Sequence, residues 1–196
     1  MEPNSIEQTV HLEEDGPSGF AIVRELPRPH RIAVVAIGLV LGVACFVRFG
    51  LTGRAVVGAV FCAVLVLLTA TDLDRRLIPN VVVLPATAVL LAAQIALYPD
   101  RTLEWVLSSL FAALFLFLPL LVVPTGMGMG DVKLAALLGV VLGKSVAAAV
   151  LLAILSAAVY SVVLLVKDGM SARKKTFAYG PFLAIAGIVV LLIGGR

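Results

Sequence analysis

Residues 131–166 read DVKLAALLGVVLGKSVAAAVLLAILSAAVYSVVLLV, and this stretch decides the class of fold. Its 36 residues are apolar almost throughout, and only Gly143-Lys144-Ser145 interrupts them. A membrane-spanning helix needs about 20 apolar residues, so the tripeptide predicts a tight turn between two such helices. The first of them, residues 131–143, rises only about 20 Å, against a hydrocarbon core of about 30 Å. We therefore expect that helix, and Asp131 near its start, to begin at or slightly below the membrane surface.

The rest of the chain has the same apolar character. Of its 196 residues, 61% are hydrophobic and 14% are charged, and the mean hydropathy is +1.12. A water-soluble domain of this size normally has fewer apolar and more charged residues than this. In lipid such continuous runs form helices, because a helix satisfies its own backbone hydrogen bonds. We predict an all-α, polytopic membrane protein with about seven transmembrane helices, within a range of about six to eight. The predicted spans cover residues 32–47, 55–71, 81–97, 103–123, 132–142, 146–166 and 177–193.

The charged residues predict how the chain is divided and oriented. Residues 1–31 are polar and are interpreted as a flexible cytosolic tail, whereas residues 32–196 form one membrane-embedded domain. If the helices alternate from a cytosolic N-terminus, ten of the 15 lysines and arginines lie on the cytosolic side. That excess has the direction of the positive-inside rule. The sequence thus predicts a multi-pass protein of the cell membrane, in contact with the lipid bilayer.

Several classes of site are not expected. The basic residues lie at the ends of apolar runs and form no basic face with interleaved aromatics, so we expect no nucleic-acid partner. Cys45 and Cys62 each lie inside an apolar run and make no CxxC pair, so we predict buried thiols, no metal and no cofactor. Glycines spaced four apart predict helix contacts, and these pairs are Gly38 with Gly42 and Gly139 with Gly143.

The acidic residues near the membrane are the candidates for chemistry, because ionisable groups are costly there and usually functional. Asp72 directly follows the second predicted span, and Asp131 directly precedes the fifth. Both lie on the predicted cytosolic side. Two carboxylates that converge share one proton, so that one activates a water while the other polarises a carbonyl group. A proton- or cation-coupled transporter that uses the same two aspartates is the alternative from another class.

Three motifs carry a resemblance to a known family. Residues 72–80 read DLDRRLIPN, residues 128–134 read GMGDVKL, and residues 179–184 read YGPFLA. Over about residues 50–194 the chain resembles the type IV prepilin peptidases, whose motifs are an aspartate seven residues before a proline, GxGDxKL, and a glycine-proline-phenylalanine start to the last helix. Presenilin-like proteases also use GxGD, but they pair it with Tyr-Asp, whereas Thr71 precedes Asp72 here.

The resemblance implies an aspartic endopeptidase at the membrane boundary. It would remove the short basic leader from prepilins or pilin-like precursors on the cytoplasmic side, for a type IV pilus or for protein secretion. The catalytic residues carried over are Asp72 and Asp131. Asp74 is interpreted as a solvated partner of the neighbouring arginines. The substrate-binding or supporting residues carried over are Gly128, Gly130, Lys133, Pro79 and Asn80.

Three points stay open at this stage. Lys133 is expected either to orient Asp131 or meet acidic groups of the substrate, or to anchor the helix at the membrane surface. Larger family members carry an N-terminal region with two zinc-binding CxxC pairs and methylate the new pilin N-terminus. This sequence resembles the short branch without that region, so the resemblance does not imply methyltransferase activity. The sequence also leaves open a homodimer and a non-catalytic homologue.

Overall fold

The computed structural model describes residues 28–75, 78–122, 128–168 and 179–194 of the chain. These residues form α-helices with two short 3-10 turns, η1 (Pro99–Arg101) and η2 (Gly143–Ser145), and no strand. The described α-helices are α3 (Arg28–Phe49), α4 (Gly53–Arg75), α5 (Asn80–Leu97), α6 (Thr102–Val122), α7 (Met129–Leu142), α8 (Val146–Asp168) and α9 (Gly180–Gly194). Each predicted span corresponds to one of them, which confirms the all-α fold. Of the predicted N-terminal tail, residues 1–27 lie outside the described residues.

The lengths of the helices fit a multi-pass membrane protein. Five stretches in the described ranges are long and apolar enough to cross a bilayer. They are Arg31–Phe49, Gly53–Asp74, Asn80–Leu97, Pro99–Leu121 and Met129–Lys167. The last stretch is a pair of helices, α7 and α8, joined by the turn η2. α9 is apolar but shorter, with 15 residues.

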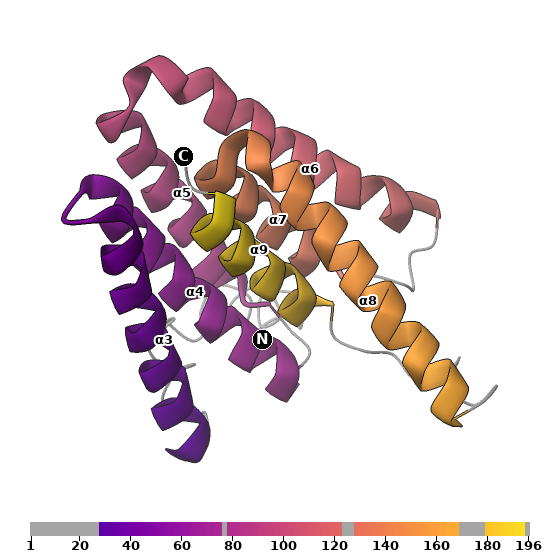
Figure 1. The fold of residues 1–196 in the computed structure, drawn as a ribbon. Helices are drawn as coiled ribbons and strands as arrows, with labels where there is room; N and C mark the ends of the chain where they lie inside the picture. Colours follow the sequence, from indigo (N-terminus) through magenta and orange to yellow (C-terminus); the bar gives the residue numbers. More distant parts are fainter. Residues whose placement is uncertain (1–27, 76–77, 123–127, 169–178, 195–196) are drawn as a thin grey trace, which may run out of the picture.

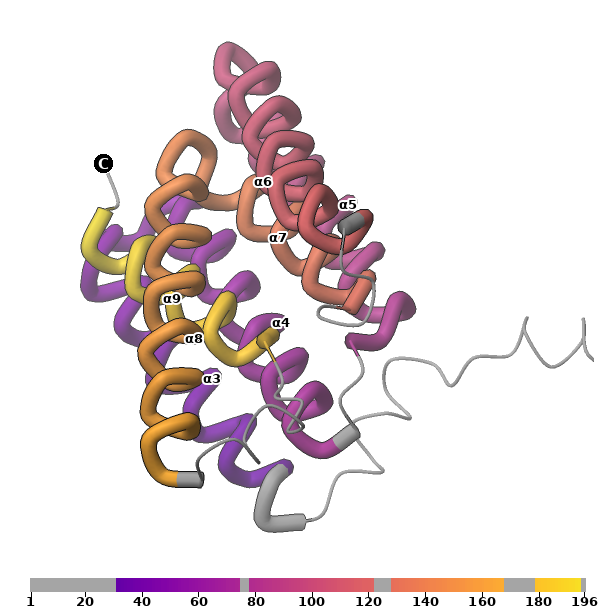
Figure 2. Tube along the Cα trace, turned by 90° about the vertical axis from the view of Figure 1, so that its right-hand side faces the viewer, coloured from indigo at the N-terminus to yellow at the C-terminus, as the bar shows by residue number. Residues whose placement is uncertain are grey.

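α7 lies in the middle of the bundle. It packs against α5, α6 and α9, and nine of its 14 residues are buried. α9 lies between α4 and α8, as Figures 1 and 2 both show. α3 lies at the edge of the bundle and packs mainly on α4 (Figure 1). Asp131 lies in the first turn of this 14-residue helix and is among its buried residues.

The predicted glycine contacts are confirmed at some positions and wrong at one. A Cβ on Gly139 would lie 2.4 Å from Ser109 Cα, so the backbones of α6 and α7 touch there. Gly143 has a φ of +56°, the left-handed conformation that lets the chain turn into η2. A Cβ on Gly42 would make an ordinary contact with Ala59, at 3.8 Å. Gly38 has no such neighbour within 4 Å, because α3 is peripheral and this part of it faces open space.

Candidate functional site

Asp72 lies in the last turn of α4 and is only 6% exposed. Its Oδ2 atom is buried and has no hydrogen-bond partner among the described residues. The carboxyl group rests on the start of α9, where a Cβ on Gly180 would lie 2.5 Å from Asp72 Oδ2. The preceding Thr71 is bonded to its own helix, since its hydroxyl donates to the carbonyl oxygen of Leu68 at 2.9 Å. The glycine at position 180 is thus what allows the carboxyl group to lie against the backbone of α9.

Asp131 lies in the first turn of α7 and is 7% exposed. Its Oδ2 accepts a hydrogen bond from the backbone N–H of Gly128 at 3.2 Å, and its own N–H donates to the Gly128 carbonyl at 3.1 Å. A carboxylate in the first turn of a helix also faces the positive end of the helix dipole. These contacts fix the direction of the side chain.

The structure brings the two aspartates to the same end of the bundle. Asp72 and Asp131 are close enough to interact electrostatically, although they belong to different helices. Ile78 lies beside Gly130, the residue before Asp131, and beside Gly180, which contacts Asp72. A Cβ on Gly130 would lie 2.8 Å from Ile78 Cβ, and one on Gly180 would lie 3.5 Å from Ile78 Cδ1. The end of α4, the segment before α5, and the starts of α7 and α9 therefore converge around the two carboxyl groups.

Lys133 links two of these elements. Its Nζ donates a hydrogen bond of 2.6 Å to Oδ1 of Asn80, the first residue of α5. Pro79 caps that helix with an extended backbone, at φ −69° and ψ 124°. The hydrogen bond that the structure shows for the Lys133 ammonium group is the one to Asn80, and the roles expected for Lys133 toward Asp131, the substrate or the membrane surface stay predictions. Lys133 therefore forms a contact between α5 and α7.

Replacing Lys133 tests that contact. Lys133→Met keeps the apolar stem and removes the donor, and Asn80→Ala removes the acceptor. Because the pair is exposed, we expect each change to lower the free energy of unfolding by only about 0.5–1 kcal/mol. Since both variants break the same bond, the double variant should be no less stable than either single one. Unfolding in mixed detergent micelles measures all three. Fully additive losses would show that Lys133 and Asn80 do not act on each other.

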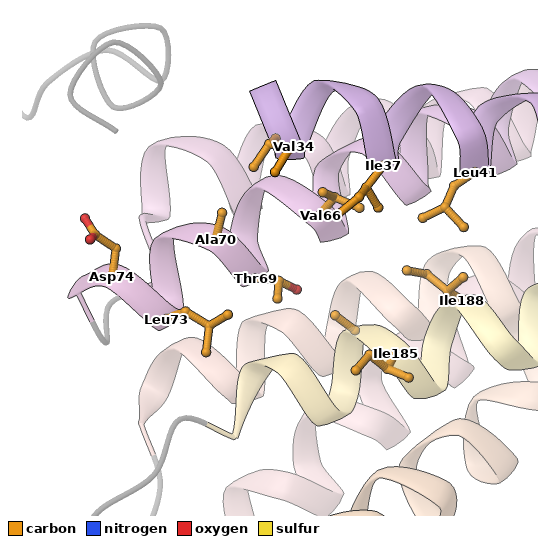
Figure 3. Close-up of a pocket in the computed structure, with 12 residues that line it drawn as sticks. Val34, Ile37, Leu41, Val66, Thr69, Ala70, Leu73, Asp74, Ile185 and Ile188 are labelled. Carbon is orange, nitrogen blue, oxygen red and sulfur yellow. The ribbon is translucent and has the colours of Figure 1, made fainter. Parts of the chain in front are cut away.

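Asp74 points away from the two buried aspartates. Side chains two residues apart on an α-helix point in directions that differ by about 200°, so Asp74 lies on the opposite face of α4 from Asp72. It is exposed and borders a cavity of about 450 Å³ between α3, α4 and α9. Figure 3 shows Asp74 at one end of this cavity, beyond Leu73 and Ala70. The lining is otherwise apolar apart from Thr69, and neither Asp72 nor Asp131 contributes to it. The cavity and the aspartate pair are therefore separate features.

The structure places two further residues, Gly180 and Tyr179, near the aspartates, and neither is among the site residues predicted from the sequence. Gly180 makes the close approach to Asp72, and Tyr179 directly precedes it. Asp131 acts electrostatically on the Tyr179 phenol. The Tyr-Gly-Pro sequence at the predicted cytosolic start of the last span was the signal that could have identified them.

The described parts of the chain show no group of three or more histidine, cysteine or acidic side chains placed to hold a metal ion. The two cysteines are buried, as expected. Their sulfur atoms lie 3.9 Å apart, and both are free thiols.

Comparison with known proteins assigns the chain to a family. Residues 59–162, a range that includes both aspartates, match the profile of the type IV leader peptidase family. The chain is 32% identical over 173 residues to a prepilin leader peptidase/N-methyltransferase of Bacillus subtilis, covering 84% of this chain and 68% of that protein. The chain belongs to the type IV leader peptidase family.

A second relative in this peptidase family is a prepilin leader peptidase/N-methyltransferase of Pseudomonas aeruginosa. It is 32% identical over 161 residues, which cover 76% of this chain and 53% of that protein. The chain thus spans about two thirds of the first relative and about half of the second. No solved structure matches it. Membership of the type IV leader peptidases confirms the peptidase class expected from the motifs.

Proposed function

We propose that this leader peptidase cuts prepilins or pilin-like precursors and that Asp72 and Asp131 are its catalytic pair. The observation that carries the proposal is the convergence of these two buried carboxyl groups at one end of the bundle. The names of both relatives support the class of substrate, since each is a prepilin leader peptidase. The relatives' second named activity, methyl transfer, is not proposed for this chain.

The chemistry follows from the proximity of the two acids. In the proposed mechanism the two carboxyl groups meet around one water molecule and share a proton, because two like charges a few ångströms apart cannot easily both be ionised. The ionised group takes a proton from a water molecule, and that water attacks the carbonyl carbon of the scissile peptide bond. The protonated group donates to the carbonyl oxygen. Which aspartate holds the proton is a property of the pair and not of either residue alone.

The orientation predicted for the chain, with Asp72 and Asp131 on the cytosolic side, fits a prepilin substrate. A prepilin has a short basic leader, a glycine before the cut and an apolar helix after it. With the helix in the bilayer and the leader in the cytosol, the scissile bond lies where the membrane meets the cytosol. We propose that Asp72 and Asp131 act at this boundary, on the cytoplasmic side of the cell membrane. Burial of both carboxyl groups at helix ends supports that depth.

A cleavage assay tests the proposed function. The purified chain in detergent or liposomes should shorten a pilin-like precursor at the glycine that ends its leader, as measured by intact mass. A precursor with that glycine replaced by a bulky residue is the control and should remain uncut. Proton or cation flux without cleavage would instead favour the transporter alternative. Neither cleavage nor flux would indicate a non-catalytic homologue.

A further inference from the structure

Tyr179 carries a hydroxyl group that the described structure leaves without a partner. The oxygen is buried and makes no hydrogen bond within the described ranges. Burying a hydroxyl group without a partner is costly, and most buried polar groups in proteins are paired. Such an orphan group calls for an explanation, and one explanation is a partner that arrives with the substrate.

Tyr179 lies in the segment that meets the aspartate pair. The next residue, Gly180, is in contact with the carboxyl group of Asp72. On the other side, burial and the negative charge of Asp131 raise the pKa of Tyr179 to about 12. The phenol therefore stays protonated at neutral pH and remains a hydrogen-bond donor. Asp131 Oδ2 already accepts the N–H of Gly128, and neither aspartate accepts a hydrogen bond from the phenol.

We propose that Tyr179 is a third catalytic residue, whose phenol donates a hydrogen bond to the carbonyl oxygen of the scissile peptide bond. This inference rests on the proposed peptidase function. A donor held in a water-poor site and aimed at the oxygen where negative charge develops stabilises the transition state. The unpaired hydroxyl of Tyr179 suits this role, because it is buried without a partner in the described structure and Asp131 acts on it electrostatically. Tyr179 also directly precedes Gly180, which contacts Asp72.

The reaction step balances without any further reactant. The water oxygen forms a bond to the carbonyl carbon, and the ionised aspartate takes the water proton. The electron pair of the carbonyl double bond moves to its oxygen, which receives the proton of the other aspartate and a hydrogen bond from Tyr179. The carbon–nitrogen bond then breaks as the leaving amine takes the proton that the first aspartate had received from water. One hydroxyl group of the intermediate returns its proton to the second aspartate, and its oxygen re-forms the carbonyl double bond. Tyr179 keeps its own proton throughout.

Tyr179→Phe removes the hydroxyl alone and tests the inference. We expect kcat for precursor cleavage to fall by about 10²–10³, the usual loss for one oxyanion donor, with KM unchanged. The melting temperature should not fall, because the change removes a buried hydroxyl that has no partner. The matched control is Tyr98→Phe at the C-terminal end of α5, which should leave kcat unchanged.

Three outcomes would overturn the inference. The first is a wild-type kcat in Tyr179→Phe. The second is a loss confined to KM, and the third is a lower kcat with an equally lowered melting temperature, which would indicate a structural role. In each case the proposed function stands if the wild type cleaves and Asp72→Asn does not. Absence of cleavage by the wild type itself would remove the proposed function and, with it, the role of Tyr179.

Discussion

We expect Asp72→Asn and Asp131→Asn each to lower the rate of precursor cleavage by at least about 10²–10⁴. Asparagine has nearly the shape of aspartate but can neither take a proton from water nor donate one to the carbonyl oxygen. Both side chains are buried, and Asp131 bonds to Gly128 through an oxygen that asparagine also provides. The helices should therefore keep their arrangement, and the loss should be in kcat. A time course of precursor cleavage, followed by mass, measures it.

Asp74→Asn is the matched control for these variants. It makes the same chemical change two residues from Asp72, on the opposite face of α4, where the side chain is exposed. We expect it to retain most of the wild-type rate. The catalytic assignment fails if Asp72→Asn or Asp131→Asn cleaves at a rate near that of the wild type. It also fails if Asp74→Asn loses as much activity as they do.

Gly180→Ala should inactivate the enzyme without touching an acidic residue. The added Cβ would lie 2.5 Å from Asp72 Oδ2 and 3.1 Å from its Cγ, so the carboxyl group must move. Because a misplacement of about 1 Å can cost about 10²-fold in rate, we expect a loss of at least that size. Rates of precursor cleavage in detergent, with melting temperatures alongside, measure the effect.

Gly38→Ala is the control for the glycine variant. Gly38 also lies in a helix, but a Cβ there meets nothing within 4 Å outside its own neighbourhood. Alanine favours a helix over glycine by about 1 kcal/mol, so this variant should be fully active and at least as stable as the wild type. Full activity in Gly180→Ala would mean that the position of Asp72 against α9 does not matter for cleavage.

The fold could be predicted from the sequence because lipid leaves few choices. Each span must be a continuous apolar helix, so the runs alone gave one stretch for each described helix, including the short α7 before the turn η2. Lateral packing was harder to predict. Gly38 and Gly139 have the same four-residue spacing to a second glycine, yet only Gly139 meets another helix backbone. Spacing shows that a close approach is possible, but which helix face is covered depends on the whole bundle.

The candidate site could be predicted in part. That Asp72 and Asp131 are buried at the same end of the bundle could be expected from their positions at the ends of apolar runs, and the motifs predicted them as a pair. The partner of Lys133 could not be predicted, because Asn80 lies 53 residues away and reaches it only through the packing of α5 on α7. Gly180 and Tyr179 were not predicted as site residues, because Asp72 belongs to α4, which is far from them in the sequence and meets the start of α9 only in the folded bundle.

Cross-linking tests the central claim, that Asp72 and Asp131 meet, most directly. In a chain with Cys45→Ser and Cys62→Ser, the pair Asp72→Cys and Asp131→Cys should be joined efficiently by a short bifunctional thiol reagent. The comparison pair is Asp131→Cys with Glu104→Cys. Glu104 accepts a hydrogen bond from the N–H of Lys144, beyond the far end of α7, and so lies about 20 Å from Asp131. We predict cross-linking of the first pair and none of the second. Labelling of both cysteines at positions 72 and 131 without any cross-link between them would contradict the account.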